Sequence, residues 1–364
     1  NPNSPAPPMS RARPSRLMPI IGLAMAMLSG AAAPPPAPTP AATPAPTLAP
    51  TLAQTRDLTV ALRDGLGARA LRPAYLDAFA ATGPTVAVAR WPGGLDTLRA
   101  HAADWDVVAI GGGDLLAGCS AGLLEKLDWK GAASPLRGLA DRLQPQAAAE
   151  CGVGAATRAT VLAWESGKVQ GSPGWADFWD VVKIPGKRGL QEGVRGNLEI
   201  ALLADGVAPA DLYRVLRTDA GVERALRKLG QLRPYIVWWR TPEDALRILR
   251  SGEALMTSAP APTVAAANQA GGPPITIQPA GSLTETVYWA MLKDSPNKAE
   301  AQRFLAFAAA PEQQAAVAAQ GAWAGLARSA NDTAQAATSV PIDTAFWRDN
   351  LEKLTVRFQA QVGK

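Results

Sequence analysis

The chain has 364 residues, of which 48% are hydrophobic and 18% charged, a balance typical of a folded protein with an extensive core. One histidine and two cysteines leave no His/Cys zinc site and no mechanism that needs several histidines. The formal net charge is +5, but the basic residues are scattered, so nucleic-acid binding is not expected. A chain of this length exceeds what one core usually serves, which favours two lobes.

Residues 1–31 have the features of an export signal. A positively charged segment, Met9–Arg16, precedes the apolar stretch Leu17–Leu28 and a run of small residues, the order of a secretory signal peptide that begins at Met9. The apolar stretch is shorter than the ~20 residues that span a bilayer, which favours a cleaved signal over a membrane anchor. We expect cleavage after Ala31 and a periplasmic location. Residues 32–55 are rich in Pro, Ala and Thr and are expected to form an extended linker.

The two cysteines, Cys119 and Cys151, agree with export. An even number of cysteines in a secreted chain suggests a disulfide, and the alternative is a pair of buried free thiols. The oxidising compartment favours the disulfide.

From residue 57 onward, short apolar strands alternate with helices. The expected elements, in chain order, are strand 57–62, helix 69–82, strand 84–89, helix 93–103, strand 105–110, strand 159–164, helix 175–181, a strand from 189, helix 196–204, helix 220–230, strand 235–239, helix 242–251, strand 253–258, helix 264–270, strand 287–292, and helices 299–309, 312–319 and 344–361. This alternation predicts an α/β fold with mostly parallel sheets. Strands as continuously apolar as 107–110 fit a sheet that helices cover on both faces.

An ordered series of segments carries a family resemblance. The segments are Trp105–Val108, Gly112–Cys119, Gly122–Asp128, Glu150–Val153, Trp175–Val181, Pro185–Leu190, Ala201–Gly206, Val237–Trp239, Gly252–Glu253, Met256–Ala259, Tyr288–Ala290, Ser295–Lys298 and Trp347–Leu354. Together they span roughly residues 57–364, and no single one is specific. In this series the chain resembles the bacterial extracellular solute-binding proteins of ABC transporters, of the spermidine/putrescine-binding type.

The resemblance implies a type II two-lobed periplasmic binding fold, with each lobe a mostly parallel sheet flanked by helices and a cleft between the lobes. We expect residues 56–162 with 259–296 to form the first lobe, and residues 163–258 with 297–364 to form the second. The resemblance also implies capture of a small organic solute and its delivery to a permease in the inner membrane. It supports the Cys119–Cys151 bridge as well. We expect a monomer with no cofactor, metal or enzymatic activity.

Three positions differ from what the family has at its ligand site. Leu62–Gly65 lacks the aromatic residue of the family, and Pro260, Ala261 and Pro262 replace a Trp-Asn-Gly segment. Val287 stands where relatives have an aspartate that meets a ligand amine. We therefore expect a polyamine-like or other amine ligand, with two alternatives: a small organic anion, or a ligand-altered fold that acts as a sensor or scaffold.

A cleft that binds an amine needs carboxylates for the charge and aromatic faces for the methylene chain. The candidate ligand-binding residues, mostly of these two kinds, are Asp64, Trp91, Asp114, Trp238, Trp239, Ser258, Glu285, Tyr288 and Trp289. Because neighbours in a strand point to opposite faces, we expect about half of the five aromatic candidates to face the cleft.

The carboxylate candidates have competing roles. Asp114 follows a run of three glycines and suits helix capping as well as ligand contact. Asp64 could form an exposed ion pair with its neighbour Arg63, and Arg63 itself would suit an anionic ligand. Glu285 could stand in for the aspartate that Val287 replaces. No GxSxG or HExxH motif is present, so no catalytic residue is expected.

Overall fold

The computed structural model describes residues 57–329 and 338–363. The predicted signal peptide and the predicted linker lie outside the described residues. None of the helices within these two ranges combines the length and the apolar character that crossing a membrane requires.

Eight strands form the main path of an 11-stranded sheet. They are β1 (Leu58–Leu62), β2 (Val86–Arg90), β3 (Val107–Gly111), β5 (Gly152–Glu165), β6 (Arg188–Gln191), β7 (Ile236–Trp239), β8 (Met256–Pro260) and β9 (Ile275–Met291). Their order in the sheet is β2-β1-β3-β9-β5-β8-β6-β7. At one end β1 pairs in parallel with β2 and β3, and at the other β6 pairs in parallel with β7 and β8. The α/β class is therefore confirmed, with parallel pairing at both ends of the sheet and antiparallel pairing of β3, β9, β5 and β8 between them.

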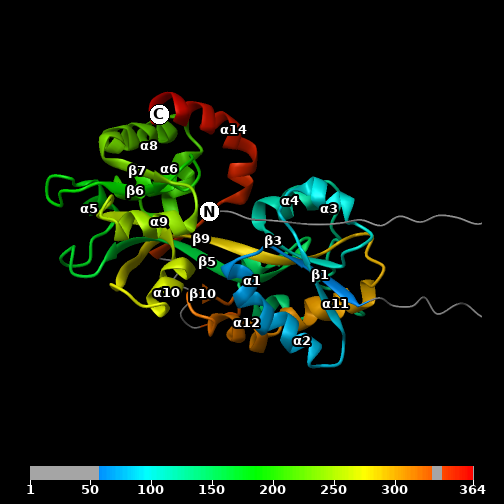
Figure 1. Cartoon of the computed structure of the whole chain (residues 1–364). Coiled ribbons are helices and arrows are strands. Elements are labelled where there is room, and N and C mark those ends of the chain that lie inside the picture. The colour runs from blue at the N-terminus through cyan, green and yellow to red at the C-terminus, as the bar shows by residue number, and fades with distance from the viewer. Residues whose placement is uncertain (1–56, 330–337, 364) are drawn as a thin grey trace, which may run out of the picture. The chain divides into compact units, whose positions relative to one another are not determined.

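The long strands β5 and β9 join the two parallel groups (Figure 1). They are antiparallel to each other, and the last residues of β9, Val287–Met291, pair with β3. Thr160–Trp164 of β5 pair with β8. Between these two regions, residues 157–159 of β5 lie opposite residues 284–286 of β9. This crossing segment is where the chain passes from one group of strands to the other.

Lobe 1 is built on β1, β2, β3 and the end of β9. Its helices are α1 (Leu66–Leu71), a π-helical turn (Arg72–Asp77), α2 (Ala78–Ala80), α3 (Leu95–Ala100), α4 (Gly112–Ser120), α11 (Lys298–Ala308) and α12 (Pro311–Ala318). One core cluster contains Tyr75, Trp289 and Phe304, and a second contains Trp91 and Leu98. The residues Val107–Ile110 of β3 contribute to both clusters, as expected for a strand buried on both faces.

Lobe 2 is built on β6, β7 and β8. Its helices are α5 (Trp175–Trp179), α6 (Asn197–Ala204), α7 (Leu212–Leu216), α8 (Asp219–Leu232), α9 (Pro242–Arg250), α10 (Ala261–Gln269) and α14 (Thr344–Gln361). The larger core cluster contains residues of α6, α8 and α14, and the smaller one contains Trp239 with residues of α9. Three short strands complete the sheet: β4 (Ala148–Ala149), β10 (Trp323–Ala324) and β11 (Ser339–Pro341).

The prediction that placed residues 297–326 in the second lobe is wrong. Phe304 of α11 and Leu326 belong to the same core cluster as Tyr75, so this segment packs in lobe 1. The error arose because an amphipathic helix shows that it has a buried face but not which sheet covers that face. Conversely, Val264 and Ile275, predicted for lobe 1, pack in the core of lobe 2.

The predicted disulfide is present. Cys119 in the last turn of α4 is bonded to Cys151, which immediately precedes β5, and their Cα atoms are 5.9 Å apart. Both residues belong to or pack against the core cluster that contains Trp91. The bridge therefore fixes α4, which begins at the cleft described below, to the strand that enters the crossing segment.

Candidate functional site

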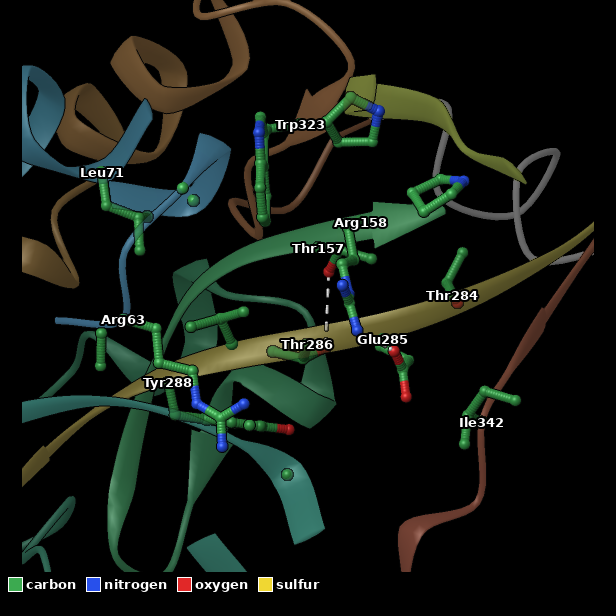
Figure 2. A pocket seen from close by; sticks show the side chains of 18 of the residues that line it. Arg63, Leu71, Thr157, Arg158, Thr284, Glu285, Thr286, Tyr288, Trp323 and Ile342 are labelled. Atoms are coloured by element: carbon green, nitrogen blue, oxygen red, sulfur yellow. Dashed lines mark hydrogen bonds and ion pairs between the residues drawn. The ribbon is translucent and has the colours of Figure 1, made fainter. Parts of the chain in front are cut away.

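A cleft of about 700 Å³ lies over the crossing segment. Lobe 1 contributes the end of β1 and the first turn of α4, and the opposite wall comes from the starts of α9, α10 and α14 in lobe 2. Figure 2 shows side chains of the crossing segment between Trp323 on one side and Ile342 on another. Residues from both lobes and from the strands that join them therefore line one space.

The floor of the cleft is polar because the crossing strands place threonines and charged residues there. Thr157 lies opposite Thr286, and their Oγ1 atoms are 3.4 Å apart. Arg158 lies directly opposite Glu285, and the two side chains point toward each other (Figure 2). The register of the two strands therefore holds Arg158 and Glu285 opposite each other.

Glu285 is shared by two arginines. Its Oε2 atom accepts from Nη2 of Arg158 at 2.7 Å, and its Oε1 atom accepts from Nη2 of Arg195 at 2.5 Å. Arg195 comes from the loop between β6 and α6 in lobe 2. The Glu285 side chain is 28% exposed. We call Arg158, Arg195 and Glu285 the arginine cluster, and it carries two positive charges and one negative charge.

The charge of Glu285 is stable. Burial acts to raise its pKa, but the charges and hydrogen bonds of Arg158 and Arg195 outweigh burial, so the pKa lies below its usual value. Because folding lowers the pKa, the ionised Glu285 carboxylate stabilises the folded protein at neutral pH. This stabilisation is lost as the pH falls through the lowered pKa. Glu285 is therefore ionised at neutral and mildly acidic pH.

Two further ion pairs lie at the lobe 1 rim of the cleft. Arg63 lies over the Trp91 ring, with 5.0 Å from its guanidinium carbon to the ring centroid, and its Nη2 atom is 3.4 Å from Oδ2 of Asp114. Asp64 pairs with Arg90. The expected ion pair between Asp64 and Arg63 is therefore wrong. Arg63 instead stacks on Trp91 and pairs with Asp114, which leaves Asp64 to pair with Arg90.

Of the two roles considered for Asp114, helix capping is wrong. Helix α4 starts at Gly112, and its N-cap is Gly111, without a side-chain cap. Asp114 lies inside the first turn, where a negative charge interacts favourably with the helix dipole. Its carboxylate is on the wall of the cleft and is partly neutralised by Arg63.

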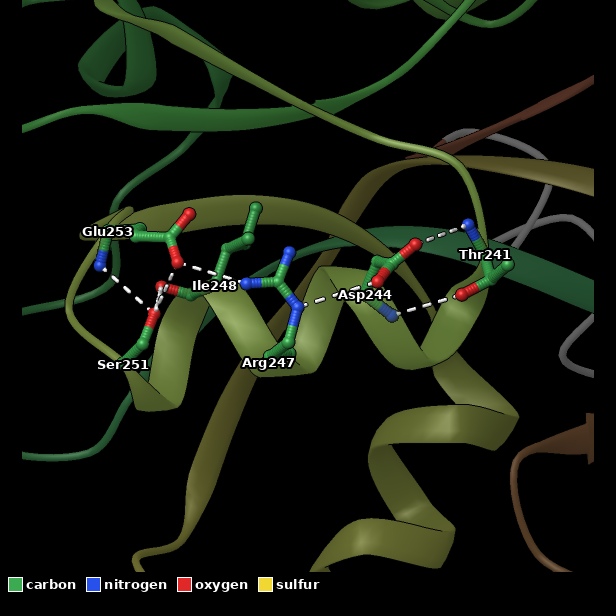
Figure 3. Close-up of polar contacts among 6 residues, drawn as sticks. All are labelled: Thr241, Asp244, Arg247, Ile248, Ser251 and Glu253. Carbon is green, nitrogen blue, oxygen red and sulfur yellow. Dashed lines mark hydrogen bonds and ion pairs between the residues drawn. The ribbon is translucent and has the colours of Figure 1, made fainter.

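Glu243 is a cleft residue that the sequence patterns did not single out. Helix α9 begins with a capping box, in which Thr241 and Asp244 each accept the other's backbone N–H at 3.2 Å. Asp244 also approaches Arg247, and Arg247 pairs with Glu253 on the side of the helix seen in Figure 3. Glu243 lines the cleft instead, and within residues 57–329 and 338–363 no basic side chain lies within ion-pair distance of it.

Of the nine predicted ligand-binding residues, four line the cleft: Asp64, Asp114, Glu285 and Tyr288. The hydroxyl of Tyr288 donates to the carbonyl oxygen of Gln146 at 3.0 Å, and burial raises the pKa of this tyrosine. The neighbourhood is partly apolar, with Trp323 and Leu71 also on the cleft wall. It offers both aromatic and aliphatic surface to a methylene chain.

The other five predicted residues do not line the cleft; four of them are buried, and Trp238 is half-buried against the core of lobe 2. The five are Trp91, Trp238, Trp239, Ser258 and Trp289. The expectation that about half of the five aromatic candidates face the cleft is wrong. Of these five, Tyr288 alone is among the described residues that line the cleft. The alternation rule failed because helices cover both faces of these strands, so both directions lead into packed cores.

The polar or charged lining residues that the sequence patterns missed are Gln146, Thr157, Arg158, Arg195, Glu243, Thr263, Thr284, Thr286 and Thr344. One signal was available for Arg158, since it interrupts an otherwise uncharged stretch, Gly152–Trp164, whose last six residues were predicted as a strand. Within the described ranges no group of three His, Cys, Asp or Glu side chains is arranged to hold a metal ion.

Comparisons with known proteins agree with this architecture. Residues 74–347 match the family model described as bacterial extracellular solute-binding protein. A gamma-aminobutyric acid-binding protein of Pseudomonas aeruginosa is 37% identical over 326 residues, which cover 84% of the chain and 91% of that relative. The structure of an ABC transporter substrate-binding protein from Bradyrhizobium japonicum has 27% identity and a TM-score of 0.73. The match covers 84% of this chain and 99% of the Bradyrhizobium chain. A structure described as the Atu4243-GABA receptor has 25% identity and a TM-score of 0.69. The match covers 85% of this chain and 98% of the receptor chain.

Proposed function

Because the chain belongs to the bacterial extracellular solute-binding proteins, we propose that its cleft captures a small zwitterionic amino acid of the γ-aminobutyrate type. A protein of this family binds a small solute and works with an ABC transporter, and it is not an enzyme. We further propose that the chain is exported through cleavage of residues 1–31 and acts as a monomer. In this proposal it delivers its ligand to a permease in the inner membrane.

The arginine cluster carries the proposal. Its two guanidinium groups and one carboxylate leave one excess positive charge on the floor of the cleft. Each guanidinium uses only part of its five N–H donors on Glu285, so donors remain for a ligand carboxylate. Planar, bidentate contact between arginine and carboxylate is among the stronger polar interactions in proteins.

The ligand ammonium group is assigned to Glu243. Three of the four lining carboxylates are each paired with an arginine: Asp64, Asp114 and Glu285. Glu243 is the remaining lining carboxylate, and it lies at the start of a lobe 2 helix rather than in the crossing segment. A positive pole and a negative pole in one cleft match a ligand whose two opposite charges are separated by a methylene chain.

A polyamine fits this distribution of charge less well. A diamine needs a free carboxylate for each ammonium group, whereas three of the lining carboxylates are already paired and the cleft also holds the excess charge of the arginine cluster. Val287 removes the aspartate expected of the polyamine-binding type, and Glu285 does not replace it because two arginines engage both of its oxygens. The 37% identity to a gamma-aminobutyric acid-binding protein supports the zwitterion.

A thermal-shift panel tests the proposal. The panel contains γ-aminobutyrate, butyrate, which lacks the ammonium group, and putrescine, which replaces the carboxylate by a second ammonium group. We expect γ-aminobutyrate at about 100 times its dissociation constant to stabilise the protein by about 2.7 kcal/mol. Butyrate should give a smaller shift, and putrescine should give none. Stabilisation by putrescine without stabilisation by γ-aminobutyrate would contradict the proposal.

A further inference from the structure

Glu285 is unusual as a lining residue because it is a carboxylate at the pole where a ligand carboxylate is expected. It comes from β9 and faces Arg158 across the strand pair, while Arg195 reaches it from lobe 2. Both of its oxygens are used within the cluster. It is therefore placed to adjust the charge of the two arginines.

The charge of the cluster decides which anionic group it can neutralise. With Glu285 ionised, the cluster has a net charge of +1, and one carboxylate brings it to zero. A group with two negative charges would leave a net negative charge in a partly buried site, where unpaired charge is costly. Without Glu285, the same two arginines would have a charge of +2 and would match a doubly charged group such as a phosphonate.

We propose that Glu285 is a specificity-determining residue that restricts the arginine cluster to ligand groups carrying a single negative charge and excludes doubly charged phosphonate or phosphate groups. This inference rests on the proposed function for the position of the ligand's acidic end. It assigns to Glu285 repulsion of the wrong ligand, a common source of selectivity at charged sites. Arg158 and Arg195 supply the attraction.

Three ligands with the same amine and the same three-carbon chain separate charge from shape. They are γ-aminobutyrate, with a planar carboxylate, 3-aminopropanesulfonate, with a tetrahedral group of charge −1, and 3-aminopropylphosphonate, with a tetrahedral group that approaches −2 at mildly alkaline pH. Their dissociation constants are measured by calorimetry at that pH for the wild type and for Glu285→Gln. Glutamine keeps the size of the side chain and removes its charge.

For the wild type we expect the phosphonate to bind at least about tenfold more weakly than the sulfonate, which has the same shape and less charge. In Glu285→Gln that ratio should fall by about tenfold or reverse. Arg195→Gln, which leaves a cluster of zero net charge, should weaken all three ligands. The double variant Arg195→Gln with Glu285→Gln restores a charge of +1 and should restore the preference for the sulfonate over the phosphonate.

Glu253→Gln is the matched control, because it removes the same charge from the turn that follows α9, where Glu253 pairs with Arg247 (Figure 3). Glu253→Gln should leave the ratios between the three dissociation constants as they are in the wild type. An unchanged sulfonate-to-phosphonate ratio in Glu285→Gln overturns the inference, and so does a Glu285→Gln variant that binds none of the three ligands. Failure of the wild type to bind γ-aminobutyrate contradicts the proposed function instead, and the sulfonate and phosphonate still report on Glu285.

Discussion

Replacing Arg158 by glutamine should weaken γ-aminobutyrate binding by about a hundredfold or more, because it removes a charged donor from the floor of the cleft. In the variant, Glu285 keeps its contact with Arg195, so the cluster loses its excess positive charge and no longer attracts a carboxylate. Arg158 has a half-exposed side chain in the crossing segment, so the fold should tolerate the change. Titration calorimetry measures the dissociation constant, and circular dichroism checks the fold.

Arg247→Gln is the control for this experiment. Arg247 is also partly exposed and also bridges to acidic residues, but it lies on the solvent side of α9. It should bind γ-aminobutyrate as the wild type does. Wild-type affinity in a folded Arg158→Gln variant would show that the arginine cluster does not hold the ligand.

Removing the disulfide should lower the free energy of unfolding by about 3–4 kcal/mol, the value that the chain-entropy model gives for a cross-link of this span. The cysteines are 32 residues apart in sequence, so the bridge restricts a long loop of the unfolded chain. We expect the double variant Cys119→Ser, Cys151→Ser to melt roughly 5–6 °C lower than the wild type. Differential scanning calorimetry measures the shift.

The same experiment has an internal control. Reduction of the wild-type protein with dithiothreitol should lower its melting temperature to that of the double variant, and the reductant should leave the variant unchanged. A melting temperature that responds neither to the substitutions nor to the reductant would contradict a stabilising role for the bridge.

The fold was largely predictable because most of its strands, apart from β5 and β9, are short, apolar and separated by helices. The strand 105–110 and the helix 344–361 agree closely with β3 and α14. The first part of β9 was missed because Gln278, Pro279 and Gly281 interrupt the apolar pattern there. The last residues of that part, Thr284–Thr286, line the cleft in the crossing segment, so they do not follow the apolar pattern of a covered strand either.

The site was less predictable, because it depends on pairings between residues far apart in the chain. Glu285 was identified as a carboxylate, but its neutralisation by Arg158 follows from a strand register with a sequence separation of 127 residues. The tryptophans were over-predicted for the opposite reason. Trp239 and Trp289 lie near strand ends, yet both are at most 2% exposed because helices cover them.

A crystal structure of the protein with γ-aminobutyrate tests the central claim most directly. We predict the ligand carboxylate at about 2.7–2.9 Å from guanidinium nitrogens of Arg158 and Arg195, with the ammonium group directed toward Glu243. An ammonium group bound to Glu285, with the carboxylate away from both arginines, would contradict this assignment of the poles.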